Sequence, residues 1–418
     1  MVRTRNGMVV THGPGGLARA EFVRPDHSMI VTQGRHWGYV QRPFTVGGVG
    51  YVQRTYVMGG VPRAFLYRPY FYHGLSLNIY VSSRFYAPAF YGWAYTPWVR
   101  PAVFSFGWGP SPWFGFYAGY FAPYPVYAGP LYWLTDYMVA ASLQDAYNQQ
   151  MQANAAAAAA AQANAGYPVV AGAPPALTPD VKQAIADEVH RQLDEERMES
   201  QGAAPAAAAP AFLSDNSTHV FVVANGLDVQ TGAATCSLTG GDVLQMTAPV
   251  PANSATANLA VLASKGQDCG RGSIVTVAVT DLAEMQNQMQ ATLDQGLANL
   301  QSRQGQNGLP AEPPAAARPA VDAAYAKAAP PPDPNIATEV SQQADAATQA
   351  ENETLAQASG PSLAGSDAPA SVSLGMTIDQ VVGMLGQPAM IGDLGSKKVY
   401  SYGNMKVIFV NGKVTDVQ

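Results

Sequence analysis

Short apolar runs that alternate with polar residues and end at glycine dominate the first 83 residues. Two of these runs form an internal repeat, because GYVQRPFTVGG at residues 38–48 recurs as GYVQRTYVMGG at residues 50–60. A period of 12 residues matches one strand and one turn, so the pattern predicts a meander of β-hairpins. Strand alternation puts apolar or aromatic groups on both faces of such a sheet, and both faces then need covering.

Residues 84–137 are the most apolar part of the chain, with Arg100 as the only charged residue between Phe85 and Thr135. Prolines interrupt the stretch before any run reaches the roughly 20 residues that a membrane-spanning helix needs. A folded Tyr/Trp/Gly/Pro layer is therefore predicted, and we expect it to cover the meander. Residues 1–130 together are interpreted as one β-rich, arginine- and aromatic-rich meander region.

Helical periodicity begins after this region. Apolar residues at helical spacing, extended by a polyalanine run, predict a helix over residues 131–165. Thr178 as N-cap and Pro179 at the first helical position predict a second helix over residues 178–200. Its buried stripe is Val181, Ile185, Val189 and Leu193. Its charged residues are expected in solvent, namely Lys182, Asp187, Glu188, Arg191, Asp194, Glu195 and Glu196.

Residues 212–302 contain five short β-branched runs separated by glycine turns, which predict a small β-barrel-like or sandwich domain. A helix is expected to follow the strands and to pack on them. Asp281 and Glu284 have the spacing of a capping box, and an apolar stripe runs from Leu282 to Leu300.

Two segments are low in large apolar residues and are interpreted as disordered Ala/Pro linkers. The first is GAAPAAAAP at residues 202–210, and the second is residues 303–371, rich in Ala, Pro, Gln and Ser. Neither buries enough surface to offset the entropy of ordering, and a frayed helix from Ile336 to Gln357 is expected within the second. Charged residues make up only 12% of the chain, against about 25% in ordinary soluble domains.

Residues 372–418 show the clearest local signals. Thr377 and Gln380 have the spacing of a capping box, and Gly386 with Pro388 ends the helix that follows. Three β-runs joined by Gly-Asn and Asn-Gly turns then predict a three-stranded antiparallel meander. The fold class predicted for the whole chain is therefore a multidomain α+β protein.

The C-terminal motifs resemble a known family. Gly375-Met376-Thr377, Gln380-Val381, Leu385-Gly386-Gln387-Pro388, Val399-Tyr400-Ser401-Tyr402, Val407-Ile408-Phe409 and Gly412-Lys413-Val414 are similar to the SmpA/OmlA family, small outer-membrane lipoproteins of the β-barrel assembly machinery. The resemblance covers about the last 45 residues and implies that family's fold and an envelope address. The chain as a whole looks like a secreted bacterial envelope protein.

Basic and acidic residues are unevenly distributed along a chain whose formal net charge is −6. Residues 1–130 contain 11 Arg, no Lys and two acidic residues, a formal charge of +9. Residues 131–418 contain 12 basic and 27 acidic residues, a formal charge of −15. Arg among aromatic residues suits stacking and bidentate contact with acidic groups, so these Arg are expected either to pair inside the protein or to hold an acidic ligand.

Arginines near the repeat and tryptophans of the aromatic stretch are the candidate ligand-binding residues. In that interpretation the rings stack on sugars and the guanidinium groups hold acidic groups of a polysaccharide. The competing interpretation places the aromatic residues in a core, because so large an apolar patch is unfavourable in water. The candidates are Arg42, Arg54, Arg63, Arg68, Arg84, Trp93, Trp98, Trp108 and Trp113.

Cys236 and Cys269 are the only cysteines, and their placement between predicted strands favours a disulfide over two buried thiols. A disulfide indicates an oxidising compartment. Residues 1–16 contain basic residues but no apolar run of 7–15 residues, so no export signal is visible. We expect an exported protein to start upstream of Met1, and a cytoplasmic protein to start at Met1.

No catalytic, metal-binding or cofactor-binding motif is recognisable in the sequence. The six histidines lie in no HExxH, HxH or Cys/His spacing, no GxSxG elbow is present, and the glycine-rich segments lack a following Lys-Ser/Thr. We therefore expect no catalytic residue, no metal ligand, no cofactor and a non-enzymatic protein.

These features predict a structural or interaction protein of the bacterial cell envelope, located in the periplasm or outer envelope or secreted. The expected partner is an envelope protein or polysaccharide, and peripheral membrane association stays open. Binding of an acidic polysaccharide or other polyanion through Arg and exposed aromatic residues is the alternative function, and the cytoplasm is the alternative location. Nucleic acid is not an expected partner, since residues 1–130 contain no Lys and no RNP-type motif.

Overall fold

The computed structural model is of the α+β class and divides into two compact units, Met1–Leu355 and Ala356–Gln418. The segments predicted as separate N-terminal regions and domains therefore lie within one unit. The structure describes residues 2–3, 7–12, 18–33, 37–58, 61–158, 176–202, 209–232, 234–251, 253–266, 268–358, 372, 376–388, 390–394, 397–402, 405–410 and 412–417.

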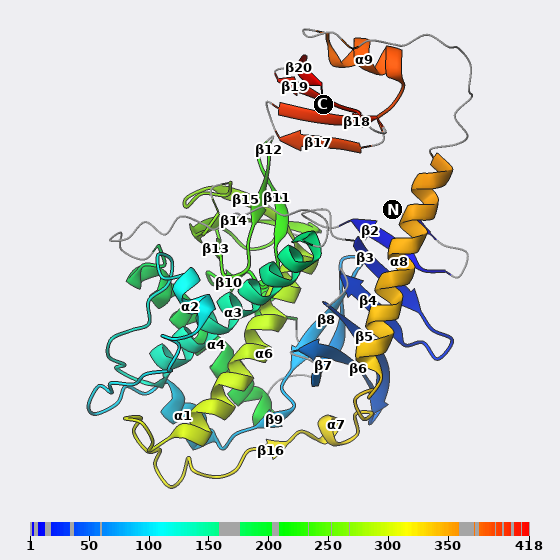
Figure 1. Cartoon of the computed structure of the whole chain (residues 1–418). Coiled ribbons are helices and arrows are strands. Elements are labelled where there is room, and N and C mark those ends of the chain that lie inside the picture. Colours follow the sequence, from blue (N-terminus) through cyan, green and yellow to red (C-terminus); the bar gives the residue numbers. More distant parts are fainter. Residues whose placement is uncertain are drawn as a thin grey trace. The chain divides into compact units, whose positions relative to one another are not determined.

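The first unit begins with an eight-stranded antiparallel sheet in sequence order (Figure 1). The repeat occupies β5 and β6, where Tyr39 lies opposite Tyr56 and Val46 lies opposite Val49, so the predicted hairpin meander is confirmed there. Gly47 and Gly48 form the tight turn, and both have positive φ, a conformation that favours glycine. The strands are β1 Val2–Arg3, β2 Val9–His12, β3 Ala18–Val23, β4 Met29–Gln33, β5 Trp37–Val46, β6 Val49–Met58, β7 Val61–Tyr72 and β8 Leu75–Val81.

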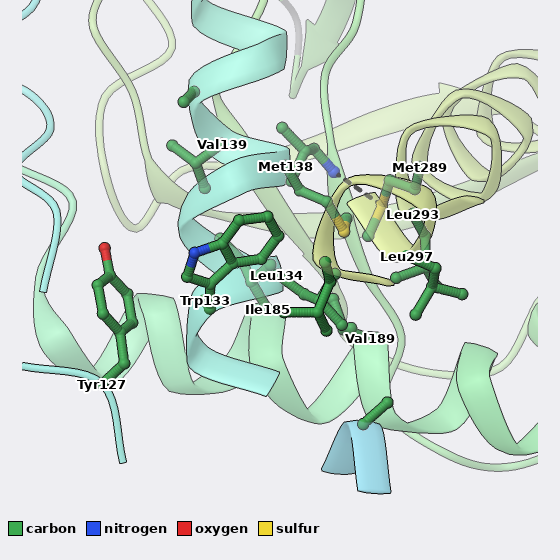
Figure 2. Close-up of a cluster of buried hydrophobic side chains, with 14 of the residues drawn as sticks. Tyr127, Trp133, Leu134, Met138, Val139, Ile185, Val189, Met289, Leu293 and Leu297 are labelled. Atoms are coloured by element: carbon green, nitrogen blue, oxygen red, sulfur yellow. Dashed lines mark hydrogen bonds between the residues drawn. The ribbon is translucent and has the colours of Figure 1, made fainter. Parts of the chain in front are cut away.

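The aromatic stretch is a folded layer, but it contains short helices rather than meander strands. Proline at the first turn starts α1 Pro88–Tyr95 and α2 Pro112–Phe116, where its missing N–H costs no hydrogen bond. The stretch packs on α3 Pro130–Ala158, α4 Pro179–Ser200 and α6 Val279–Arg303. Among the described residues, none from β1–β8 belongs to this cluster, so the expectation that the stretch covers the sheet was wrong. Figure 2 shows part of this core, in which Trp133 and Leu134 of α3 lie beside Ile185 of α4 and Leu297 of α6.

Helix α4 begins after Thr178 as predicted, and its stripe of Val181, Ile185, Val189 and Leu193 is buried. The prediction of a solvated charged face was wrong for Lys182, Glu188 and Glu196, which are all buried. Each lies three residues from a stripe position, so it shares the helix face that packs inward. The part of the predicted 131–165 helix beyond Ala158 lies outside the described residues.

Residues 212–302 form a six-stranded antiparallel sheet followed by α6. The strand order is β10-β13-β14-β15-β11-β12, and no pairing among the described residues closes it into the predicted barrel. Sequence reasoning missed β11. Helix α6 begins at Val279, so the predicted Asp281 cap was wrong. The strands are β10 Val220–Val222, β11 Leu227–Thr231, β12 Ala234–Leu238, β13 Val243–Met246, β14 Thr256–Ala263 and β15 Ile274–Ala278.

Residues 303–358 are not the predicted flexible linker. Strand β16 Val321–Asp322 pairs with β9 Arg84–Phe85, and α7 Ala324–Lys327 and α8 Ile336–Ala358 follow. Helix α8 confirms the helix expected at residues 336–357, although it is docked rather than part of a tether. Helix α8 lies along the N-terminal sheet (Figure 1), with Ile336 and Val340 packed on Ile30 and Val40. Residues 203–208 and 359–371 of the two predicted linkers lie outside the described residues.

The second unit is a helix and a four-stranded antiparallel sheet in sequence order. The capping box of Thr377 and Gln380 is confirmed, and the core contains Val381, Val407 and Phe409. The structure adds β17 to the predicted three strands, as an edge strand that leaves Met390 exposed and so lacks a strong alternation signal. The elements are α9 Ile378–Leu385, β17 Met390–Leu394, β18 Lys397–Tyr402, β19 Met405–Val410 and β20 Lys413–Val417.

Candidate functional site

Cys236 and Cys269 form a disulfide, as predicted, with their Cα atoms 5.4 Å apart. The bond links β12 to the loop before β15, and both residues are buried in the core of the six-stranded sheet. Among the described residues, no helix has the length and apolar character needed to cross a membrane.

Arg54 is an internal anchor, with only 4% of its surface exposed. Its Nη1 lies 2.8 and 2.9 Å from the two carboxylate oxygens of Glu284 at the start of α6. Its guanidinium carbon lies 4.8 Å from the ring centroid of Tyr39 and 4.6 Å from that of Tyr67. Glu284 therefore holds α6 to the N-terminal sheet in place of capping the helix.

The other candidate arginines do not gather into one binding surface. Arg42 pairs with Asp333 in the segment before α8, and Arg63 donates to Gln295 Oε1 at 3.3 Å. The guanidinium carbon of Arg68 lies 5.9 Å from the ring centroid of Tyr51. Arg68 also lines a cavity of about 770 Å³, which is described below. Arg84 lines a smaller cavity of about 230 Å³.

The candidate tryptophans belong to the aromatic core cluster or pack against it, rather than forming an exposed platform. Trp98 and Trp113 are buried, while Trp93 and Trp108 are half-buried and packed against the cluster. Trp108 stacks on Phe106 with ring centroids 3.9 Å apart. These four side chains therefore belong to or pack against a core, as the competing interpretation expects.

A cavity of about 770 Å³ lies between β7, β8, α4, α5 Ala211–Ser214 and α6, and we call it the α4–α6 pocket. Its charged lining residues are Glu195, Glu196 and Glu199 of α4 and Arg68 of β7, a formal charge of −2. Of the sequence candidates, only Arg68 lines it.

Glu196 of the pocket lining is paired with a second buried carboxyl, that of Asp294, which lines the smaller cavity. Glu196 is hydrogen-bonded to Asp294 of α6, and it also accepts a hydrogen bond from the hydroxyl of Tyr91. Asp294 accepts from Tyr80 Oη at 2.6 Å and from Ser82 Oγ at 3.1 Å. Burial and the neighbouring Asp294 raise the pKa of Glu196, and burial raises the pKa of Asp294 to about 6. The two carboxyls therefore share a proton near neutral pH.

Other polar groups of the pocket have raised pKa values or lack a hydrogen-bond partner in the described part of the chain. Burial and the nearby charge of Glu188 raise the pKa of Glu195 to about 7. Burial raises the pKa of Glu199, an effect that Arg68 opposes. The side-chain oxygens of Gln192 and Gln286, which both line the pocket, have no hydrogen-bond partner among the described residues. The pocket thus offers more hydrogen-bond acceptors than the protein itself satisfies.

Two other buried charge networks are structural. Lys182 Nζ lies 2.6 Å from Asp136 Oδ1, inside the aromatic core. His219 lies between Glu188 of α4, at 3.3 Å, and Asp215, at 2.9 Å, and Arg191 also contacts Glu188. Both networks join α4 to its neighbours. Among the described residues, no group of three or more His, Cys, Asp and Glu side chains is arranged to hold a metal ion.

Sequence reasoning missed the pocket residues because it assigned Glu195 and Glu196 to a solvated face. One signal was available, since Glu196 follows Leu193 by three residues and so continues the buried stripe. No signal along the chain indicated that Asp294, almost 100 residues away, would face Glu196. Comparison of the chain with models of protein families, with curated proteins and with solved structures finds no match.

Proposed function

We propose that this chain is a non-enzymatic binding and interaction protein of the bacterial cell envelope, and that the α4–α6 pocket is its ligand site. The pocket carries the proposal. Its volume of about 770 Å³ is within the range of small-molecule sites, and apolar walls surround a few convergent polar groups. Glu196 of the lining is engaged by Tyr91 and by Asp294 behind it, an arrangement that supports a fixed wall rather than a reacting group.

The disulfide supports the proposed address, because structural disulfides persist in oxidising compartments outside the cytoplasm. The resemblance of residues 372–418 to the SmpA/OmlA family also supports an envelope address. We propose an envelope protein or polysaccharide as the partner of the chain.

Binding of an acidic polysaccharide through Arg and aromatic residues has weaker support. Arg42 and Arg54 are already paired with Asp333 and Glu284. Trp98 and Trp113 are buried and cannot stack on a ligand without unfolding their surroundings.

Thermal unfolding of the full chain with a panel of amines, neutral sugars, acidic sugars and amino acids tests the ligand site. Ser214→Trp places a large side chain at the pocket lining, whereas Ser217→Trp adds the same ring at an exposed position outside it. We expect at least one class to raise the Tm of the native chain and of Ser217→Trp but not of Ser214→Trp. Equal Tm shifts in the two variants, or none with any class, contradict a ligand site in this pocket.

A further inference from the structure

We propose that residues 96–128 and 302–319 of the first unit form one interaction surface, and that its partner is a lipid bilayer that contains anionic lipids. We call this surface the Arg100 face. The inference goes beyond the proposed function, because the α4–α6 pocket has no lining residue in either segment.

The first segment exposes almost only apolar residues and glycines. Apart from Thr96, Arg100 and Ser105, every exposed position between residues 96 and 128 is Pro, Gly, Ala or Val. Val99 is completely exposed, and Val103 and Val126 are 72% and 44% exposed. Soluble proteins rarely leave large apolar patches in water, so a surface of this kind indicates a contact with another body.

A short backbone bridge joins two of the loops that carry these valines. Ala102 and Tyr127 exchange two hydrogen bonds, each 2.8 Å long. Val103 follows one bridge residue and Val126 precedes the other, so the two valines lie close together. Tyr127 is buried in the aromatic core, which fixes both loops in place.

Residues 302–319, which follow α6, extend the surface. Leu309 and Ala316 belong to the same aromatic core as the first segment. Gly308 lies against the carbonyl group of Val103, where a Cβ would not fit. The exposed residues of this second segment are Ser, Gly, Gln, Asn, Ala and Pro, together with two arginines.

Charge favours an anionic partner. The single acid of the two segments, Glu312, is buried, and its backbone N–H donates to the side chain of Gln304. The next acid along the chain, Asp322, lies opposite Arg84 in the β16–β9 pair. Basic residues near a membrane surface are attracted to anionic lipids. All exposed charges of the two segments are positive, namely Arg100, Arg303 and Arg318.

The Arg100 face fits a bilayer better than an acidic polysaccharide. Sugars stack on exposed rings, but each aromatic residue between 96 and 128 is buried or half-buried. Half-buried rings such as Trp108 and Tyr124 are of the kind that membrane interfaces favour. Proline has no backbone N–H, so prolines among lipid head groups leave fewer donors unpaired. The exposed prolines of the first segment are Pro97, Pro101, Pro110, Pro112 and Pro125.

Co-sedimentation of the full chain with lipid vesicles tests the inference. Vesicles of phosphatidylcholine alone are compared with vesicles of phosphatidylcholine and phosphatidylglycerol. We expect binding to the anionic vesicles, and we expect added salt to weaken it. Arg100→Gln should weaken this binding by about fivefold. Val99→Asp should weaken it by about tenfold or more, because it removes apolar contact and adds a like charge.

Matched changes outside the face are the controls. Arg63→Gln and Val23→Asp alter exposed positions of β7 and β3 in the same way. Each should bind anionic vesicles within about twofold of the native chain. Val99 is completely exposed, so its replacement leaves the packing of the unit intact. Equal weakening by the test and control variants contradicts the inference, and so does a native chain that binds neither kind of vesicle.

Two further outcomes would assign the face to a different partner and overturn the inference. One is binding of alginate, but not of vesicles, that Arg100→Gln weakens. The other is a dimer that Val99→Asp dissociates, again without vesicle binding. Ser214→Trp, the pocket variant, should bind vesicles as the native chain does. Membrane binding is therefore tested separately from the ligand site, and a loss of vesicle binding in Ser214→Trp would contradict the assignment to the Arg100 face.

Discussion

Arg54 illustrates how the positive N-terminal region and the acidic remainder interact inside one unit. The sequence left two alternatives for its arginines, internal pairing or an acidic ligand, and Arg54 adopts the first by contacting Glu284. Arg54 and Glu284 are 230 positions apart in the sequence, so no local pattern encodes this pairing.

Replacement of Arg54 by Met should lower the free energy of unfolding by about 2 kcal/mol, because Gln41 and two tyrosine rings lose a buried partner. The loss is moderate because Glu284 is 52% exposed and water can solvate it. Urea denaturation measures the change. Arg63→Met is the control, because Arg63 is exposed and makes one long hydrogen bond. It should change the free energy of unfolding by less than about 0.5 kcal/mol. Equal losses in the two variants would rule out the anchoring role of Arg54.

Stability should fall as the pH rises from about 5 to 8. Hydrogen bonds and charge from Glu188, aided by Asp215, outweigh burial and the charge of Arg191 and raise the pKa of His219 above 6.5. Its stabilising effect is therefore complete below pH 6.5 and is lost as the pH rises through the folded pKa. The raised pKa values of Asp294, about 6, and Glu195, about 7, act in the same direction because folding favours their protonated forms.

Urea denaturation at several pH values checks this slope, and His219→Gln isolates one contribution. The variant should show a smaller loss of stability between pH 6 and 8 than the native chain, whatever its stability at pH 6. The pKa of Glu188 is lowered by His219 and Arg191 despite its burial, so its own stabilising effect is lost only below about pH 4.5, outside this window. A stability that rises between pH 6 and 8 would be inconsistent with the described His219 contacts.

At the scale of elements, α3 and α6 approach closely at a glycine. A Cβ on Gly296 would lie 3.0 Å from Leu134 Cδ2 and 3.1 Å from Tyr137 Cδ1, closer than ordinary packing permits. Gly296→Val should therefore destabilise the unit by about 1–3 kcal/mol through overpacking. Ser302→Val, an exposed position of the same helix, should stay within about 0.5 kcal/mol. A Gly296→Val protein as stable as the native chain would show that the helices are not packed at this point.

Elements with strong local signals were predictable, and elements that depend on distant surfaces were not. The repeat gave β5 and β6, Thr178 and Pro179 gave the start of α4, and the capping box gave α9. Helix α8 was expected as a frayed helix within a flexible tether, because the segment around it has few large apolar residues. Its docking depends on a glycine far away in the sequence. Gly38 of β5 leaves room for α8, because a Cβ there would lie 2.8 Å from Val340 Cγ1.

The pocket was less predictable than the elements around it. It combines residues of α4 and α6 with residues of β7 and β8, which lie far apart in the sequence and so share no local pattern. Strand β11 was missed for a related reason. Val229 is its only fully buried residue, so its alternation is too short to recognise along the chain.

At the scale of the whole molecule, the disulfide constrains the six-stranded sheet. It closes a separation of 33 residues, which corresponds to about 3–4 kcal/mol in the chain-entropy description. Reduction with a membrane-permeant phosphine should therefore lower the urea midpoint of the first unit. A midpoint unaffected by complete reduction would show that the bond adds nothing to its stability.

A location outside the cytoplasm is the central claim, because the envelope role and the envelope partner depend on it. Fractionation of cells that express the protein natively, with thiol alkylation before lysis and mass spectrometry of the purified chain, tests it most directly. The prediction is a protein in the periplasmic or outer-envelope fraction, with Cys236 bonded to Cys269 and no alkyl label on either. A cytoplasmic protein with both cysteines alkylated would contradict it.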